Sequence, residues 1–266
     1  MKETLKEMFG LSGKVAIVTG GNRGIGKGIA MGLAGAGANI VIGDINIEVE
    51  DEAGAADAVT EIRRDFGVEA LGLKVDVRRE ADNMEMVRRT LDRFGRIDIL
   101  VCNAGMGGGG ILPQDMAVAK WDEILETNLR SFFIAAKAVY PAMKKGGGGK
   151  IISIGSMTSI FGVGAFSAYG ASKGGVLQLT RSLAVGWARD KIQVNCILPG
   201  WINTGLSETA KKNNPELEER VIARTPTGRW GEPVDLVGCA LFLASRASDF
   251  VTGAAIPVDG GYAARG

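Results

Sequence analysis

Three polar side chains in the second half of the chain have the types and spacing of a proton-transfer site. Tyr169 and Lys173 are four residues apart in a helical pattern, so they fall on one face of a helix. Ser156 precedes the tyrosine by thirteen residues. A phenol ionises at about pH 10 in water, and a nearby ammonium lowers the pKa of that phenol by favouring its charged form. We therefore expect Tyr169 to act as a general acid–base near neutral pH.

The composition excludes several other chemistries. The chain has no histidine, which excludes a Ser-His-Asp or Cys-His nucleophile and any histidine-ligated metal. Its three cysteines, Cys102, Cys196 and Cys239, are widely separated and lie in apolar stretches. We expect these thiols to be buried and inert, with no metal bound, and their low number suits a reducing compartment.

A glycine-rich turn near the N-terminus predicts a dinucleotide site. Residues 19–26 read Thr-Gly-Gly-Asn-Arg-Gly-Ile-Gly and stand between a predicted strand and a predicted helix. Glycines there let the backbone approach a pyrophosphate, whose charge then meets the helix N-terminus. The spacing Gly-x-x-x-Gly-x-Gly departs from the general Gly-x-Gly-x-x-Gly pattern. The residues of this turn that we expect at the cofactor are Gly20, Asn22, Arg23, Gly24, Ile25 and Gly26.

The ends of three further predicted strands carry residues that suit the same ligand. Asp44 lies about 20 residues beyond the glycines, where a carboxylate accepts from the adenosine ribose hydroxyls. Asp76, followed by Val77, is placed to meet the adenine amino group. In parallel sheets of this kind, ligands collect at the carboxyl edge. The residues that end the fourth predicted strand at this edge are Asn103, Ala104 and Gly105.

The elements that must hold these residues alternate between strand and helix. Aliphatic and β-branched runs, typical of strands covered on both faces, occupy residues 14–18, 40–42, 70–75, 97–101, 151–154, 194–198 and 255–258. Helical patterns such as Met84, Val87 and Leu91 separate them. This succession predicts an α/β fold, a Rossmann-type, doubly wound, seven-stranded parallel sheet with helices on both faces. The glycine runs 107–110 and 146–149 are loops rather than linkers, so we expect a single domain over residues 1–266.

Length and charge narrow the class of partner. The chain has 266 residues, of which 46% are apolar and 23% charged, so it can bury a core of its own. Its net charge, 31 − 30 = +1, predicts no nucleic-acid or membrane partner. Residues 1–10 form an N-terminal extension without the apolar region of a signal peptide, and no run reaches the roughly 18 apolar residues of a membrane helix. We expect a cytoplasmic protein.

Taken together, the motifs resemble those of the short-chain dehydrogenase/reductase family, over residues 11–262 of this chain. The residues that carry the resemblance are 19–26, 103–105, Asn128, Ser156, Tyr169, Lys173, Pro199 and Gly200. It implies an NAD(P)-dependent hydride transfer between nicotinamide and a secondary alcohol or ketone. By the same resemblance, Tyr169 moves the proton, and Ser156 holds the substrate oxygen. Lys173 lowers the pKa of the phenol and holds the nicotinamide ribose.

The resemblance also assigns roles outside these three residues. Asn128 lies within a predicted helix, where asparagine has low propensity, and would hold a water that links the lysine to solvent. Pro199 and Gly200 end the sixth predicted strand. The following Ile202 and Thr204 would contact the nicotinamide carboxamide and the phosphate.

The substrate is indicated less directly. Residues 201–230 resemble the family's mobile substrate loop, which covers the pocket after binding. Candidate pocket walls are Met157, Phe161, Phe166, Trp201 and Leu206. Much of the chain, including residues 228–231 and 259–261, is most similar to bacterial sugar-acid and polyol dehydrogenases of the family. We therefore expect an oxidoreductase that acts on a sugar acid, a polyol or a similar small hydroxylated substrate.

Two other functions fit the same fold. A 3-oxoacyl-carrier-protein or acyl-CoA reductase has the same four residues, and such enzymes place arginines that dock the acidic carrier beside the active site, before the fifth strand and after the tyrosine helix. Here these positions are the glycines of 146–149 and Arg189, Asp190 and Lys191, and Asp190 would repel an acidic partner. A non-catalytic dinucleotide sensor is the more remote alternative, because it has no need of the phenol–ammonium pair.

Two residues argue in opposite directions about the cofactor. Arg23 matches a position where many NADP-using relatives carry a basic residue for the 2′-phosphate. Asp44 matches a position where NAD-using relatives bind the ribose diol. The short, fixed carboxylate repels the phosphate, whereas an arginine that is half exposed is screened and can pair with Asp44 instead. We therefore expect NAD, with NADP the weaker cofactor.

Two helices suggest an assembly. Around residues 128–143 and 174–188, apolar residues fall on more than one face, which suits burial on both sides of a helix. They include Ala135, Ala136, Ala138, Leu177, Leu179 and Leu183. In the family these two helices form a dimer interface, and dimers pair into closed tetramers. We expect a homotetramer.

Overall fold

The computed structural model describes residues 4–47 and 57–265 of the chain. In this part, seven parallel strands form one sheet in the order β3-β2-β1-β4-β5-β6-β7. The strands are β1 (Val15–Thr19), β2 (Asn39–Asp44), β3 (Ala70–Lys74), β4 (Ile99–Cys102), β5 (Gly149–Ile154), β6 (Ile192–Pro199) and β7 (Ala255–Val258). The predicted fold is therefore confirmed, and the predicted ends of the strands differ from the observed ends by at most two residues.

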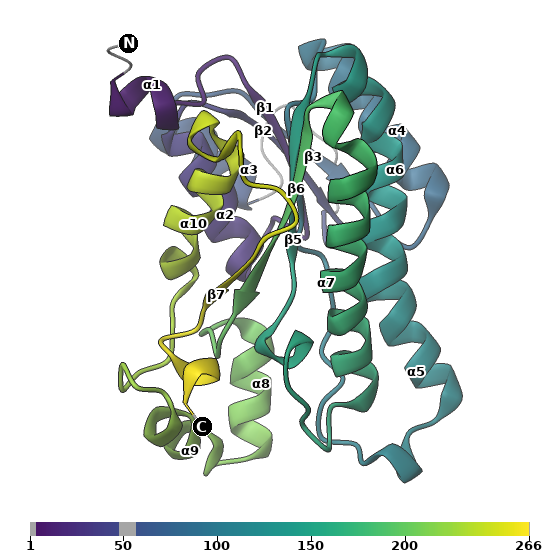
Figure 1. Ribbon diagram of the computed structural model, residues 1–266, viewed down its shortest axis with the longest axis vertical. Helices are drawn as coiled ribbons and strands as arrows, with labels where there is room; N and C mark the ends of the chain where they lie inside the picture. Colours follow the sequence, from purple (N-terminus) through teal and green to yellow (C-terminus); the bar gives the residue numbers. More distant parts are fainter. Residues whose placement is uncertain (1–3, 48–56, 266) are drawn as a thin grey trace.

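Helices cover both faces of the sheet (Figure 1). One face carries α2 (Gly24–Gly35), α3 (Asp57–Phe66) and α10 (Val237–Ala244). The other carries α4 (Glu80–Phe94), α5 (Val118–Leu125), α6 (Ser131–Lys145) and α7 (Ser167–Trp187). The predicted N-terminal extension contains α1 (Leu5–Phe9), which contacts the short turn η6 (Arg246–Ser248). None of the described helices is long and apolar enough to cross a membrane.

Alternate residues of each strand supply two apolar cores, one on each face of the sheet. Val18 and Ile42 belong to the core that α2 shares through Ile29. Their neighbours Ile17 and Val41 point the other way, into the core that includes helices α4, α6 and α7. Because both faces of the central strands are covered, their apolar runs are continuous rather than alternating with polar residues.

The chain reverses its direction across the sheet between β1 and β4. It runs outward from β1 to β3, returns to β4 beside β1, and continues to β7 at the far edge. In an open parallel sheet, the loops that follow the two strands at such a reversal separate and leave a crevice at the carboxyl edge. The glycine turn of residues 19–26 and the Asn-Ala-Gly segment of residues 103–105 are these two loops.

Two expectations about burial are wrong. Met84 was expected on the apolar stripe of its helix, but it lies on the outer face of α4 and is 53% exposed. Strand β7 is not covered on both faces, since Pro257 is exposed and Ile256 is half-buried. The reason is position: β7 is an edge strand, paired only with β6.

Candidate active site

The glycine turn and the Asn-Ala-Gly segment are fastened to each other at the crevice. The Asn103 side-chain amide donates to the carbonyls of Thr19 and Gly20, at 3.0 and 2.9 Å. Gly20 has a φ of +63°, and a Cβ added there would lie 2.9 Å from the Cα of Ala104. Only glycine meets both conditions without displacing backbone. The Thr19 hydroxyl accepts from the backbone N–H groups of Asn103 and Ala104.

The N-terminus of α2 is open toward the crevice. Arg23 is the N-cap residue, but its side chain makes no capping hydrogen bond and is exposed. The first amides of the helix are therefore not capped by this side chain, which is the arrangement that receives an anion. Thr204 lies directly opposite, because a Cβ added to Gly24 would be 3.4 Å from its Cγ2 atom. The glycine turn thus fits a dinucleotide pyrophosphate.

Asp44 is buried at the end of β2 and is held in place by its neighbours. It is 5% exposed, and its carboxylate accepts from the Asn22 N–H at 3.2 Å and from the Asn46 N–H at 2.9 Å. In the described part of the chain, no ion pair joins it to Arg23. The pairing of Arg23 with Asp44 that was expected is therefore not observed, and the Arg23 side chain is exposed.

Asp76 has a partner that the sequence did not suggest. The Arg78 guanidinium donates to both of its carboxylate oxygens, with distances of 2.7–3.2 Å. This fork holds the pKa of the Asp76 carboxyl below its usual value. Val77, the next residue, is buried in the core, and the pair therefore fixes the end of this segment beside the crevice.

The Ser156, Tyr169 and Lys173 side chains converge at the carboxyl ends of β5 and β6. Lys173 is 6% exposed, its Nζ donates to the carbonyl oxygen of Ile154 at 2.7 Å, and it lies 5.7 Å from the centre of the Tyr169 ring. The Ser156 hydroxyl oxygen accepts from the Thr158 N–H at 3.1 Å. This bond uses the hydroxyl oxygen as an acceptor and leaves the serine hydroxyl proton to be donated to the Tyr169 oxygen or to a ligand oxygen.

The pKa of the phenol moves against expectation. Burial raises the pKa of Tyr169, and the hydrogen bond with Ser156 opposes this rise only in part. Burial also lowers the pKa of the Lys173 ammonium to about 8. On balance the phenol pKa is therefore raised and not lowered as was expected. The ammonium is directed to the Ile154 carbonyl, and desolvation of the phenolate is the larger effect.

Asn128 was expected within a regular helix, but it does not lie in one. It is on a π-helical turn, η2 (Glu126–Arg130), inserted between α5 and α6. Its Oδ1 accepts from the Met106 N–H at 2.8 Å, and its Nδ2 donates to the Met106 carbonyl at 3.0 Å and to the Ser172 hydroxyl at 3.1 Å. The Ser172 hydroxyl in turn donates to the Tyr169 carbonyl at 2.7 Å. A π turn is common at functional sites, and here it aims the amide across the crevice.

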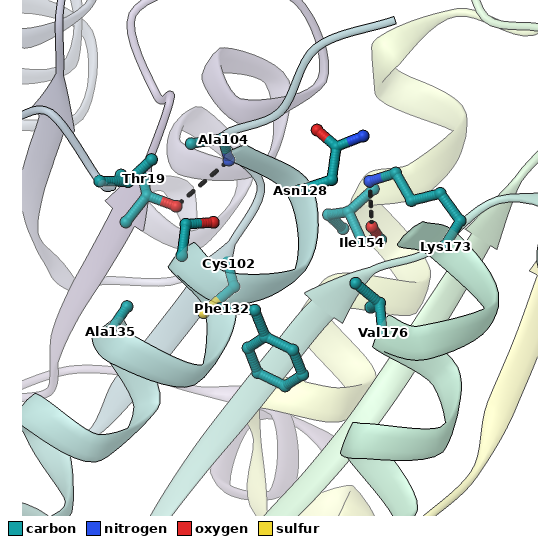
Figure 2. Close-up of a pocket in the computed structure, with 11 residues that line it drawn as sticks. Thr19, Cys102, Ala104, Asn128, Phe132, Ala135, Ile154, Lys173 and Val176 are labelled. Carbon is teal, nitrogen blue, oxygen red and sulfur yellow. Dashed lines mark hydrogen bonds between the residues drawn. The ribbon is translucent and has the colours of Figure 1, made fainter. Parts of the chain in front are cut away.

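A small pocket joins these elements beneath the crevice (Figure 2). Thr19 of β1, Asn128 of η2 and Lys173 of α7 supply polar groups to its lining, and Phe132 and Val176 supply apolar walls. Asn128 and Lys173 point toward the same space in Figure 2. A Cβ added to Gly105 would lie 3.1 Å from the Asn128 Oδ1 atom and 3.7 Å from the Lys173 Nζ atom, so both groups border the same space.

The segment after β6 closes the crevice from the opposite side. Pro199 ends the strand, and the Gly200 N–H donates to the Val258 carbonyl at 3.0 Å. Ile202 is buried and forms an isolated parallel bridge with Gly231. Between Ile202 and Gly231, the predicted loop 201–230 contains two helices, α8 (Gly205–Asn213) and α9 (Leu217–Arg224).

The candidate wall residues differ in burial. Leu206 is 60% exposed on α8 and lies over Gly107, where an added Cβ would be 3.1 Å from its Cδ1 atom. Met157 is 6% exposed and belongs to the protein interior. The remaining three, Phe161, Phe166 and Trp201, are half-buried. The Phe166 ring meets the Tyr169 ring edge to face, with 6.1 Å between centroids, so Phe166 adjoins the reacting phenol.

Known proteins share this sequence and this fold over almost the whole chain. A family model described as enoyl-(acyl carrier protein) reductase matches residues 20–263. The 2-dehydro-3-deoxy-D-gluconate 5-dehydrogenase of Escherichia coli K12 is 40% identical over 261 residues, covering 97% of this chain and 98% of that one. The 7alpha-hydroxysteroid dehydrogenase of the same strain is 38% identical over 251 residues, 94% of each chain. The chain belongs to the short-chain dehydrogenase/reductase family.

A solved structure of another family member is also similar to this chain in sequence and in fold. The structure is assigned as an NAD(P)-dependent gluconate 5-dehydrogenase from Beutenbergia cavernae and contains NADP at low occupancy. It is 35% identical, has a TM-score of 0.87, and the match covers 96% of this chain and 99% of that one. This short-chain dehydrogenase/reductase is therefore an oxidoreductase that uses a pyridine nucleotide.

Three side chains of this dehydrogenase/reductase site were not singled out from the sequence. Thr19 anchors the Asn-Ala-Gly segment, Ser172 links Asn128 to the tyrosine backbone, and Ser159 lies on the turn after Ser156. A capping box pairs an N-cap Ser or Thr with a polar side chain three residues later, usually Glu or Gln, and Ser156 and Ser159 have this spacing, which could have identified Ser159.

Two expectations concern groups outside the active site, namely the three thiols and the segments compared with carrier-protein reductases. The three thiols were expected to be buried, but only Cys196 is, whereas Cys102 and Cys239 are half-buried. Burial nevertheless raises the pKa of all three thiols, that of Cys239 to about 11, which supports the prediction that they are inert. The segments compared with carrier-protein reductases are not beside the active site. The glycines of 146–149 and Asp190 precede β5 and β6, at the amino edge of the sheet, whereas Ser156 and Pro199 are at the carboxyl edge. Asp190 is paired with Lys144 at 3.1 Å.

Proposed function

We propose that this protein is an NAD-dependent dehydrogenase of a sugar acid or a closely related polyhydroxy acid. The observation that carries the proposal is the convergence of the Ser156 hydroxyl, the Tyr169 phenol and the buried Lys173 ammonium beside the glycine turn. Two of the similar proteins described above are named for oxidation of gluconate or of a deoxygluconate derivative. The substrate class rests on these names, and the reaction class on the site.

In the proposed reaction, the chain's own groups handle the proton and the substrate oxygen. The Ser156 hydroxyl donates to that oxygen, since the bond from the Thr158 N–H orients the hydroxyl and does not use its proton. Tyr169 takes the hydroxyl proton during oxidation and returns it during reduction. Lys173 stabilises the phenolate electrostatically, and Asn128 holds a bridging water next to Lys173 in the small pocket. The bound nicotinamide supplies the hydride acceptor or donor.

The cofactor contacts follow the crevice from end to end. The amides of Gly24, Ile25 and Gly26 face the pyrophosphate together with Gly20, while Asn22 supports Asp44. Asp76, Val77 and the segment 103–105 adjoin the adenosine half. Pro199, Gly200, Ile202 and Thr204 adjoin the nicotinamide half, opposite Tyr169 and Lys173.

The choice of NAD over NADP rests on Asp44. Its carboxylate is buried and fixed by two backbone N–H groups, so it cannot turn away from a 2′-phosphate. Arg23 is exposed and free to move toward such a phosphate, but its attraction is screened by solvent. The fixed charge dominates the mobile one.

The proposal extends to the moving parts and the assembly. Helices α8 and α9, within residues 201–230, form the substrate loop, with Leu206 placed over the crevice. We also propose a cytoplasmic homotetramer, although not all of the residues expected at its interface are exposed. Ala135 and Leu177 are already buried within one chain, whereas Phe133 on α6 and Val185 on α7 are 48% and 82% exposed. These two exposed side chains support an interface along both helices.

A spectrophotometric screen tests the substrate. Gluconate, 2-dehydro-3-deoxygluconate, polyols, hydroxysteroids and 3-oxoacyl thioesters would each be offered with NAD⁺ or NADH at 340 nm. We expect the highest kcat/KM with a sugar acid and NAD⁺ or its keto form and NADH. A higher kcat/KM with a steroid or with an acyl thioester would overturn the proposed substrate class.

A further inference from the structure

The Ser159 hydroxyl forms hydrogen bonds with two parts of the catalytic centre, the backbone of Ser156 and the backbone of Lys173. Its oxygen accepts from the backbone N–H of Ser156 at 3.2 Å, and its O–H donates to the backbone carbonyl of Lys173 at 2.8 Å. Ser159 therefore occupies one short path between the residue assigned to the substrate oxygen and the residue assigned to the phenolate. Nothing in the roles proposed above uses this hydroxyl.

The first of these bonds shapes the serine turn. Residues Met157–Ser159 form a short helical turn, η3, with Ser156 as its N-cap. Both serine hydroxyls accept a backbone N–H of this turn: the Ser156 hydroxyl accepts from Thr158 N–H, and the Ser159 hydroxyl accepts from Ser156 N–H. Together these two bonds set the direction of the Ser156 side chain.

The second bond goes beyond capping. A capping serine needs only to accept, yet the Ser159 hydroxyl also donates across the site to α7. Lys173 is consequently tied to the segment from Ile154 to Ser159 at two points: its Nζ reaches the Ile154 carbonyl at 2.7 Å, and its own carbonyl receives the Ser159 hydroxyl. These two bonds fix the position of Lys173 relative to the segment that carries Ser156.

We propose that Ser159 is a positioning residue, whose hydroxyl sets the distance between the Ser156 hydroxyl and the Lys173–Tyr169 pair. This inference rests on the catalytic roles proposed for those three residues. It does not depend on which alcohol is oxidised, because Ser159 acts through the backbone of the machinery and not on a substrate.

The test compares Ser159→Ala with two other variants. Ser159→Thr keeps the hydroxyl. Ser153→Ala is the matched control, since the Ser153 hydroxyl also ties β5 to α7, through Thr180 at 2.8 Å, but lies outside the serine turn. We expect Ser159→Ala to lower kcat roughly ten- to a hundredfold with KM for NAD⁺ unchanged. Ser159→Thr should restore most of the rate, and Ser153→Ala should lose a comparable amount of thermal stability without losing kcat.

Two further readouts separate positioning from general weakening. In a Ser156→Ala background, Ser159→Ala should lower kcat much less than it does alone, because both changes remove the same alignment. The [ε-¹³C]lysine NMR titration of Lys173 should also move in Ser159→Ala but not in Ser153→Ala, and this readout needs no substrate. Full additivity of the two serine changes, together with an unmoved Lys173 titration, would overturn the inference. Failure of sugar acids as substrates would overturn only the proposed substrate.

Discussion

The ammonium of Lys173 donates to the main-chain carbonyl of Ile154 at 2.7 Å and lies 5.7 Å from the centre of the Tyr169 ring. The lysine is therefore engaged with the end of β5 rather than with the phenol itself. Its effect on Tyr169 acts through space, and burial still keeps the phenol pKa raised.

Replacing Tyr169 with phenylalanine removes the proton donor and keeps the ring. We expect kcat to fall by roughly 10²–10⁴, the usual contribution of a general acid–base. The dissociation constant for NADH, measured by fluorescence titration, should change little. Turnover close to that of the wild type in this variant would show that another group moves the proton.

Stability should depend on pH through Lys173. Burial lowers its folded-state pKa from 10.5 to about 8, so between these values the unfolded chain binds more protons than the folded one. Folding stability contributed by this group therefore increases as pH rises from about 8 toward 10.5, by at most about 3 kcal/mol.

The comparison with Lys173→Met isolates this effect. Urea unfolding of both proteins at pH 7, 8, 9 and 9.5 should show the wild type gaining stability relative to the variant above pH 8. A difference that stays constant over this range would mean that the lysine titrates near its ordinary value.

Asp44→Ala should relax the choice of cofactor. Wild-type enzyme should prefer NAD⁺ over NADP⁺ by roughly ten- to a hundredfold in kcat/KM, on the order of 1–3 kcal/mol. In the variant the repulsion disappears, and the exposed Arg23 should then favour NADP⁺. Adding Arg23→Ala to Asp44→Ala serves as the control and should remove that gain. A wild-type preference for NADP⁺ would contradict the weight given to Asp44.

Gly26→Ala should damage the glycine turn specifically. An added Cβ would lie 2.2 Å from the Gly20 carbonyl oxygen, which is backbone and cannot give way cheaply. We expect a lower melting temperature, and we expect NADH to bind more weakly by roughly tenfold or more. Gly186→Ala is the matched control, because nothing lies within 4 Å of its added Cβ on α7. That change should stabilise the helix by about 0.5–1 kcal/mol and leave binding unchanged.

Light scattering tests the assembly. A homotetramer of a 27.8 kDa chain has a mass of about 111 kDa, that is 4 × 27.8. Val185→Asp places a charge on the exposed face of α7 and should shift the mass downward if this face is an interface. A monomer mass for the wild type at micromolar concentration would contradict the proposal.

The sequence by itself determined the succession of strands and helices, and it predicted most of the candidate site residues. These features are local: hydrophobic periodicity reports burial within one element, and glycines at 20 and 24 report positive φ within one turn. The order of the residues along a parallel sheet then places them at one edge. For this reason Ser156, Tyr169 and Asn103 could be assigned to one crevice before any coordinates.

Only the tertiary structure decided how those residues meet. The partner of the Lys173 ammonium is 19 residues away, and the partner of the Asn128 amide is 44 residues away in Ser172. Such pairs depend on which strands are neighbours and on how a helix packs over them, and local patterns contain neither. The π turn at Asn128, the two bonds of Ser159 and the raised pKa of Tyr169 follow from packing and desolvation, which arise only when the chain is folded.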